Sequence, residues 1–500
     1  MDQRHDERSS PARTRDAMIN PSLGIDALHF SLPRLTLPME ALAQARGIEA
    51  DKLRFGLGLS SMAVCDTDED VVTLAAEAAW NLIQREKIDP HTLGRIYLGT
   101  ESAVDAAKPS STYVLGLLEK RWEATLGPRS LKHCDALDMT FACVGGVDAL
   151  HNSLDWVRAG SGRKALVIAA DVAKYAPESP GEYTQGAGAV ALLITENPRI
   201  LALDSDFGVA IESVGDFFKP RRTFSKAILL QEAALLLGQT LSLEDAHTLT
   251  QSAHAGFWGT PEAHIDQFLE HPVFDGPFSN DCYVSRLREA LDQYQQANGH
   301  AVLKDWDAMV FHLPYAFQGR RMWPEIAVEL LDAEGRLHEI IEAIGQPDVD
   351  LQDRKALAKL WSKTAQYKAY VNAFIAPGER ASQEIGNMYT ASIFMALLST
   401  LVDSLHQGVD LAHKRIGFLS YGSGSKSKVF SGVVQPEYAA QLQGVKPFHH
   451  LDQRTSIDFA TYTQLHQRRL KSPASKPSGA SLTHIGTEGT AQGYRTYSLA

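Results

Sequence analysis

The chain of 500 residues has few cysteines, no long apolar run and no excess of positive charge. Its four cysteines, Cys65, Cys134, Cys143 and Cys282, are widely spaced and include no C-x-x-C pair, which argues against a disulfide framework and a structural zinc site. This usage is typical of a reducing cytosol, so we expect a cytoplasmic protein. No apolar run is long enough to span a bilayer, and we expect no membrane partner. A formal net charge of −12 argues against nucleic acid as a partner.

The composition is that of a globular protein, with 44% hydrophobic and 22% charged residues. The length indicates two or more domains, or one large domain built from duplicated halves. Residues 1–20 are polar, charged and without periodicity, and they lack the apolar core of a secretory signal. We interpret them as a disordered N-terminal extension.

An apolar stretch, residues 94–100, reads as a buried strand that runs directly into Glu101. Further on, apolar residues recur every three or four positions after Cys143, which predicts a helix that starts at this cysteine. The apolar stretch 164–171 predicts a second strand. This block therefore has the order strand, polar residue, helix with a reactive first residue, strand.

A later block repeats the same order. The stretch 306–312 is an apolar strand that ends on His312, residues 386–408 predict a helix with small residues at its start, and residues 415–425 predict another strand. Strands that alternate with helices predict parallel sheets covered by helices on both faces. We therefore expect an α/β fold of two similar halves in an α/β/α/β/α layering.

The expected division places residues 21–203 in the N-terminal half and residues 204–500 in the C-terminal half. Residues 221–270 do not fit the repeated order and are helical in character, so we interpret them as an insertion. In sheets of this kind, ligands bind beyond the carboxyl ends of the strands. Glu101 and His312 both follow a strand and are expected there.

Cys143 is the first candidate for a functional residue. A thiol at a helix N-terminus has a lowered pKa, because it faces the positive end of the helix dipole. Gly145 and Gly146 would let a substrate approach the backbone closely. The backbone N–H of Cys143 could then stabilise the oxyanion formed when the thiolate attacks a thioester. The alternative is a small buried hydrophobic residue, which is our interpretation of the other three cysteines.

Three further side chains complete the candidate site. Partial burial would raise the pKa of Glu101 and suit it to removing a carbon-bound proton, although it is also an ordinary acid for a helix N-terminus. His312 can donate a proton to a developing alkoxide. Asn387 is either an N-cap or a residue that holds a carbonyl oxygen. Their order, at equivalent points of a repeat, favours an active site.

Several basic residues stand out in an acidic chain. They could contact the phosphates of coenzyme A or of a phosphopantetheine carrier, or they could form a solvated face. They are Lys219, Arg221, Arg222, Arg320, Arg321, Lys426 and Lys428.

From about residue 23 to the end, the chain resembles the 3-hydroxy-3-methylglutaryl-coenzyme A synthases of the thiolase superfamily. The motifs that carry the resemblance occur in the right order along the chain. They are "GIDALHFSLPR", "SMAVCDTDEDVVTLAAEAA", "GTESAVDAAKPSS", "ACVGGVDALHNS", "GEYTQGAGAVALLI", "DFFKP", "FDGPFSNDCY", "FHLPYAF", "GNMYTASI", "YGSGSKSKVF" and "GYRTY".

The resemblance implies the duplicated thiolase fold, a homodimer and a catalytic role for three residues. Cys143 would become acetylated, Glu101 would remove a proton from the acetyl methyl group, and His312 would hold and protonate the ketone oxygen of the acetoacetyl substrate. Substrate-binding roles are implied for Tyr175, Thr184, Asn387, Ser423, Arg320 and Arg321. Of these, Tyr175 and Asn387 would orient acyl groups, and the backbone of Ser423 would join the oxyanion hole.

The implied reaction condenses acetyl-CoA with acetoacetyl-CoA, as in the mevalonate pathway of isoprenoid biosynthesis, and needs no metal or redox cofactor. One alternative is a synthase that uses an acyl carrier protein to add β-branches to polyketides. Phe317 leaves room for it, because members of the family often carry a lysine at this position, five residues after the histidine. The same holds for the insertion 221–270.

Three other functions are less consistent with the sequence. A papain-like hydrolase also has Cys, His and Asn in this order, but it would not need Glu101, and the chain has no C-G-S-C-W-like motif. A decarboxylating ketoacyl synthase is disfavoured by Glu101 in "GTES". A non-catalytic scaffold would have no reason to keep all three reactive side chains.

Overall fold

The computed structural model describes residues 22–253, 257–260, 262–346 and 350–499, so the predicted N-terminal extension lies outside the described residues. Its centre is a ten-stranded sheet, in which β9 (Gly208–Ile211) pairs only with β16. The other strands follow in the order β14 (Ala308–Phe311), β15 (Arg415–Gly422), β16 (Lys426–Val434), β8 (Leu201–Leu203), β1 (Leu23–Ser31), β7 (Gly186–Glu196), β6 (Lys164–Ala173), β4 (Leu93–Gly99) and β5 (Asp135–Met139).

The strands of the two halves form one hydrogen-bonded path, because β8 pairs with β1 on one side and with β16 on the other. β8 ends at Leu203, where the sequence places the end of the N-terminal half. The sequence pattern predicted parallel sheets, but not all of the strands are parallel. β4 is parallel to β5 and β6, and β14 to β15, but β7 is antiparallel to both β6 and β1. A short connection without a crossover helix joins β6 to β7, so the chain must turn back.

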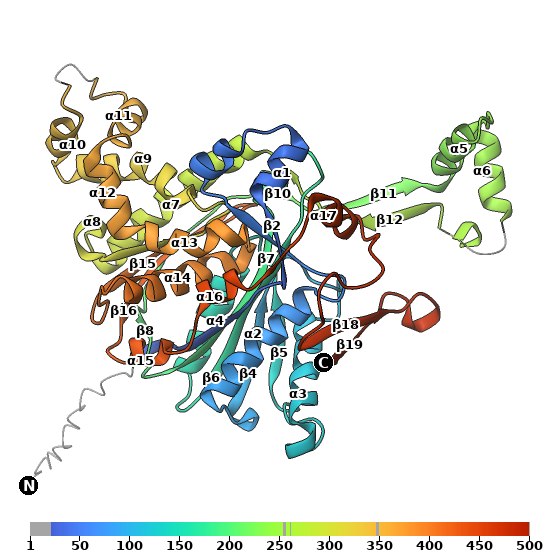
Figure 1. Cartoon of the computed structure of the whole chain (residues 1–500), viewed down its shortest axis with the longest axis horizontal. Helices are drawn as coiled ribbons and strands as arrows, with labels where there is room; N and C mark the ends of the chain where they lie inside the picture. Colours follow the sequence, from blue (N-terminus) through green and yellow to red (C-terminus); the bar gives the residue numbers. More distant parts are fainter. Residues whose placement is uncertain (1–21, 254–256, 261, 347–349, 500) are drawn as a thin grey trace, which may run out of the picture.

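Helices cover both faces of each half and give the predicted α/β/α/β/α layering (Figure 1). α2 (Val71–Glu86) and α3 (Ser110–Leu126) cover the outer face of the N-terminal half. α4 (Gly145–Arg158) and α14 (Ser392–His406) form the central layer, where Gly146 packs against Phe394. α7 (Gly276–Asn298) covers β9, β15 and β16, with α9 (Gln318–Ala333) beside it. In the described ranges, no helix has both the length and the apolarity needed to cross a membrane.

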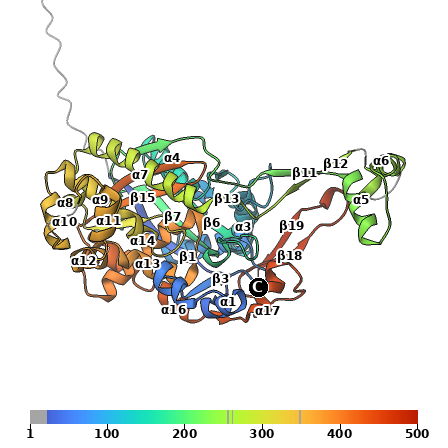
Figure 2. The same cartoon turned by 90° about the horizontal axis from the view of Figure 1, so that it is seen from above.

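The predicted insertion forms an arm that extends away from the body (Figures 1 and 2). β11 (Arg221–Ser225) and β12 (His264–Phe268) pair as an antiparallel ribbon, and α5 (Lys226–Leu236) and α6 (Leu243–Ser252) lie at its far end. The expected helical character is confirmed. A second hairpin, β18 (Ala480–Ile485) with β19 (Arg495–Leu499), lies on the same side of the body.

Candidate active site

Cys143 lies in a tight turn between β5 and α4. Its φ of 59° is in the left-handed region, and the helix begins two residues later, at Gly145, not at Cys143 as predicted. The backbone of neighbouring segments lies very close to this turn. A Cβ on Gly99, at the end of β4, would lie 2.3 Å from the backbone nitrogen of Gly146. The glycines therefore bring the strand end and the cysteine turn together, and a larger side chain would push them apart.

The predicted lowering of the Cys143 pKa is wrong. Burial raises the pKa of this thiol well above its usual value, and the carboxylates of Glu101 and Asp171 raise it further. The physical reason is that the Cys143 thiol lies before the first residue of the helix and in an apolar environment, which disfavours the charged thiolate. Cys143 is only 8% exposed and packs with Tyr175, Tyr389, Phe217, Ala173 and Ala142. The resting side chain is therefore the neutral thiol, which must lose its proton as it attacks.

Glu101 lies next to Cys143, as the sequence predicted. Its Oε2 accepts a hydrogen bond from the backbone N–H of Cys143 at 3.0 Å, and its Oε1 lies 3.3 Å from the ammonium nitrogen of Lys219. Burial raises the pKa of Glu101 to about 7, Lys219 opposes this shift and Asp171 adds to it. The expected upward shift is confirmed, and the carboxylate titrates close to neutral pH, where a general base is most effective.

Asp171, near the end of β6, holds Glu101 in place, and sequence reasoning missed it. Its Oδ1 accepts hydrogen bonds from the backbone N–H of Glu101 at 2.9 Å and from the hydroxyls of Thr100 at 2.9 Å and Ser102 at 2.7 Å. Its Oδ2 accepts from the N–H of Thr390 at 3.0 Å and its hydroxyl at 2.6 Å. A charged residue in the apolar stretch "KALVIAAD" was the signal that could have revealed it.

His312 follows β14, as predicted. Its backbone N–H donates to the carbonyl of Leu419 at 3.0 Å, and its carbonyl accepts from the hydroxyl of Tyr283 at 2.9 Å. Its imidazole is buried, and Nδ1 has no hydrogen-bond partner among the described residues. Burial lowers the pKa of His312 to about 3, so the imidazole is neutral and donates a proton only as a neutral N–H. The ring centroids of Tyr283 and His312 lie 6.2 Å apart. Burial and then Cys143 raise the pKa of Tyr283.

Tyr175, Thr184 and Asn387 surround the same turn. The ring of Tyr175 packs edge-on against Tyr389, with 6.3 Å between centroids. The N–H of Asn387 donates to the carbonyl of Thr184 at 2.9 Å, and Oδ1 of Asn387 accepts from the N–H of Tyr389 at 2.8 Å. Asn387 thus holds the first residue of the short helix η5 (Tyr389–Ala391), which has Met388 at its N-cap and precedes α14. The predicted contacts of these residues with acyl groups stay predictions.

Ser423 lies just beyond β15, against the cysteine turn. A Cβ on its neighbour Gly422 would lie 1.9 Å from the carbonyl oxygen of Ala142, so the two backbones are in close contact. The Ser423 hydroxyl lies 3.3 Å from that of Ser279. Buried Asp216 accepts from the Ser279 hydroxyl at 3.0 Å. The strand end predicted to supply the oxyanion hole is therefore next to Cys143.

Of the basic residues, the structure places Lys219 at Glu101 and the others elsewhere. Arg320 forms a two-pronged ion pair with buried Glu379, with 2.9 Å from Nε to Oε1, and covers the ring of Phe317. Arg321 donates to the carbonyl of Gly56 at 3.1 Å. Lys426 and Lys428 both pair with Asp148. Arg221 and Arg222 belong to the arm. The prediction that Arg320 and Arg321 bind substrate remains untested by these contacts.

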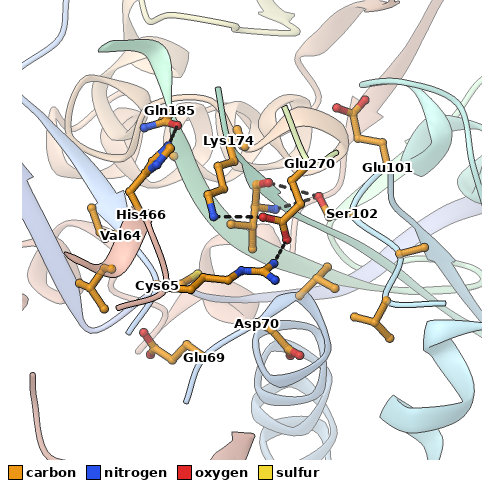
Figure 3. A pocket seen from close by; sticks show the side chains of 18 of the residues that line it. Val64, Cys65, Glu69, Asp70, Glu101, Ser102, Lys174, Gln185, Glu270 and His466 are labelled. Atoms are coloured by element: carbon orange, nitrogen blue, oxygen red, sulfur yellow. Dashed lines mark hydrogen bonds and ion pairs between the residues drawn. The ribbon is translucent and has the colours of Figure 1, made fainter. Parts of the chain in front are cut away.

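A cavity of about 920 Å³ reaches Glu101 from the side of the arm and the C-terminal segment. Figure 3 shows Lys174 and Glu270 pointing toward each other across it, 3.0 Å apart, and Glu270 also pairs with Arg468. Neither Cys143 nor His312 lines this cavity. Within the described ranges, no three His, Cys, Asp or Glu side chains are grouped as metal ligands would be. The prediction that no metal is required stays a prediction.

Family models match most of the chain: the hydroxymethylglutaryl-coenzyme A synthase N-terminal model covers residues 20–199 and the C-terminal model residues 264–479. The chain belongs to the hydroxymethylglutaryl-coenzyme A synthase family. The resemblance found in the sequence is confirmed, as is its class as an acyl-CoA condensing enzyme.

Relatives and solved structures agree with this family. The chain is 29% identical to the hydroxymethylglutaryl-CoA synthase of Haloferax volcanii, over 89% of this chain and 91% of the relative. It is 28% identical to that of Enterococcus faecalis, over 88% and 90%. The structure of MvaS in complex with 3-hydroxy-3-methylglutaryl coenzyme A is 29% identical, with a TM-score of 0.71, over 96% of this chain and 99% of that one. The curacin pathway HMG synthase, at 22% identity and a TM-score of 0.69, shows the same fold. The predicted thiolase-like fold is confirmed.

The Arg320–Glu379 pair predicts that two neighbouring arginines contribute differently to the free energy of unfolding. Arg320→Met would leave the Glu379 carboxylate buried without its partner, and we expect a loss of about 3–5 kcal/mol in the free energy of unfolding. Arg321→Met removes an exposed side chain and should cost less than about 0.5 kcal/mol. Urea unfolding followed by circular dichroism measures both. Equal losses would contradict a structural role for Arg320.

Proposed function

We propose that the chain condenses acetyl-CoA with acetoacetyl-CoA and water to give 3-hydroxy-3-methylglutaryl-CoA. The observation that carries the proposal is the hydrogen bond between Glu101 and the N–H of Cys143, because it sets a carboxylate with a pKa of about 7 beside a thiol. Two relatives of known structure support the substrate class, since one is complexed with 3-hydroxy-3-methylglutaryl coenzyme A and one with CoA.

In the first step, the sulfur of Cys143 attacks the carbonyl carbon of acetyl-CoA. The thiol gives up its proton, the bond between the acyl carbon and the sulfur of coenzyme A breaks, and coenzyme A leaves as the protonated thiol. The cysteine carries the acetyl group as a thioester. The close contact between Gly422 and the carbonyl of Ala142 brings backbone from both halves to the neighbourhood of this sulfur, where an oxyanion develops.

In the second step, Glu101 removes a proton from the acetyl methyl group. The resulting carbanion attacks the ketone carbon of acetoacetyl-CoA, and the ketone oxygen takes a proton from the neutral imidazole of His312 and becomes the hydroxyl group. The imidazole regains a proton from the Glu101 carboxylic acid formed in the same step, so both side chains return to their resting forms. Water then cleaves the thioester, which restores the Cys143 thiol and leaves a free carboxylate on the product. Lys219 keeps the pKa of Glu101 from rising further, so that the base is ionised near neutral pH.

We also propose a cytoplasmic homodimer that acts in the mevalonate pathway. The absence of any disulfide among its four cysteines, all of them free, supports a reducing compartment. β5 supports dimerisation, because it ends the sheet with an unpaired edge on which Leu137 is 42% exposed. The alternative use of acyl carrier proteins gains no support beyond likeness of fold.

Mass spectrometry of the intact protein tests the order of steps. After incubation with acetyl-CoA, we expect one acetyl group, located on Cys143. Glu101→Gln should keep this adduct and lose condensation by about 10²–10⁴-fold, the usual contribution of a general base. Cys134→Ala removes a cysteine that is not part of the site. It is the control and should behave as the unchanged protein. An adduct on another residue, or one that vanishes in folded Glu101→Gln, would refute the assignment.

The pH dependence of condensation tests the ion pair of Glu101. The rate should fall as the pH drops through about 7, because the base becomes protonated. Lys219→Met removes the charge that lowers this pKa, so the acid limb of kcat/KM should move to higher pH. Lys219→Arg keeps the charge and should leave the limb near its original place. A limb that does not move in Lys219→Met would show that this lysine does not tune the base.

A further inference from the structure

The arm consists of residues 221–268, from β11 to β12. The N-terminal family model stops at residue 199 and the C-terminal model starts at residue 264, so nearly all of the arm lies between them. Its helices α5 and α6 lie far from α4, the helix that follows the cysteine turn, in both views (Figures 1 and 2). The helices of the arm therefore do not carry the reactive groups, and their exposed surface must be explained separately.

The end of the arm exposes a row of leucines. Leu235, Leu236 and Leu237 are 71%, 89% and 80% exposed, and Leu249 of α6 is 51% exposed. α5 also exposes Ile228, so its apolar residues are not confined to one face. A helix that is apolar on all sides is normally buried, and a large exposed apolar patch marks an interaction site.

The chain's own body does not cover these leucines. Among the described residues, α5 and α6 pack mainly against each other, and the ribbon of β11 and β12 holds them away from the sheet. Just beyond the base of the arm, Glu270 pairs with Lys174 and Arg468 beside the cavity. The partner that covers the leucines must therefore be a different molecule.

The charge at the end of the arm narrows the choice of partner. Glu232, Glu244 and Asp245 are exposed, whereas Lys226 is buried and donates to the carbonyl of Thr260 at 3.1 Å. An acidic, apolar surface repels anionic lipid, which disfavours a membrane surface. The remaining class of partner is a protein with an exposed apolar surface.

The direction of the arm points to a second copy of this chain. The sheet ends at β5 on the side toward which the arm extends, and the β18–β19 hairpin lies on that side as well (Figure 1). The hairpin exposes Ile485 and Tyr494, at 40% and 52%, and β5 exposes Leu137. A molecule that covers β5 would lie on the side toward which the arm extends. The β5 strand of a second chain could pair with this open strand edge and complete it.

We propose that the arm clasps the partner subunit of a homodimer, with the leucines of α5 packed on the partner's surface beside its β5 edge. The inference rests on the homodimer proposed above and names the element that holds it together. In a twofold dimer each chain gives one arm and receives one, so each contact occurs twice. Because the base of the arm lines the cavity beside Glu101, the clasp also fixes one wall of that cavity.

Sedimentation equilibrium of the full chain measures the contribution of the leucines. Leu236→Glu places a charge in the proposed contact and should raise the dimer dissociation constant by at least about 30-fold, as for a central interface residue. Gln239→Glu adds the same charge to an exposed polar position of the same tip and is the matched control, with a change below about 3-fold. Equal constants for the unchanged protein and Leu236→Glu would overturn the proposal.

A photo-crosslinking residue at position 236 identifies the partner directly. Mixed with an isotope-labelled copy, the protein should form crosslinks between labelled and unlabelled chains, at peptides near β5. Crosslinks within one chain, or to another protein from the host cell and not to a second copy, would overturn the proposal. A chain in which a two-residue turn replaces residues 226–263 gives a second check, since its dimer should dissociate at least as readily as that of Leu236→Glu.

The acetyl adduct on Cys143 separates the two proposals. Measured in the same samples, acetylation that persists while the dimer weakens supports the clasp. Absence of the adduct in the unchanged protein would refute the proposed function and leave the result on the clasp standing.

Discussion

The carboxylate of Asp171 joins the two halves of the molecule at the point where the reactive groups meet. It is fully buried, yet it accepts hydrogen bonds from the Glu101 loop on one oxygen and from Thr390 on the other. A buried charge is tolerated only when such donors replace the lost water. Glu101 and the short helix before α14 are thus held by one buried carboxylate. The distance between base and thiol depends on this shared anchor.

Close backbone contact is the second constraint. Gly99 and Gly422 end strands from different halves, and each touches the turn of Cys143 so closely that no side chain fits. The repeated β/α plan brings two strand ends to one place, and the glycines let them approach to contact distance. Burial follows directly, and with it the raised pKa values of Glu101 and Cys143 and the lowered pKa of His312.

Much of this could be read from the sequence, because period and order are local properties. The strands before Glu101 and His312, the layering and the helical insertion were all predicted from such patterns. What failed depends on distant partners. The thiol pKa was wrong because Phe217 and Tyr389, far along the chain, bury Cys143. The prediction of parallel sheets was only partly right, since β7 runs antiparallel after a loop that contains one short helical turn, η3 (Glu182–Thr184), and no crossover helix. No local signal pairs Arg320 with Glu379.

The hydrogen bond between Cys143 and Glu101 couples two events in time. This N–H stabilises the ionised form of Glu101 and so lowers its pKa. An acyl oxygen that takes the same N–H as its donor removes that stabilisation, and the proton affinity of Glu101 then rises. The loaded cysteine thereby faces a stronger base than the empty one. A single peptide amide can in this way delay full basicity until there is a methyl group to deprotonate.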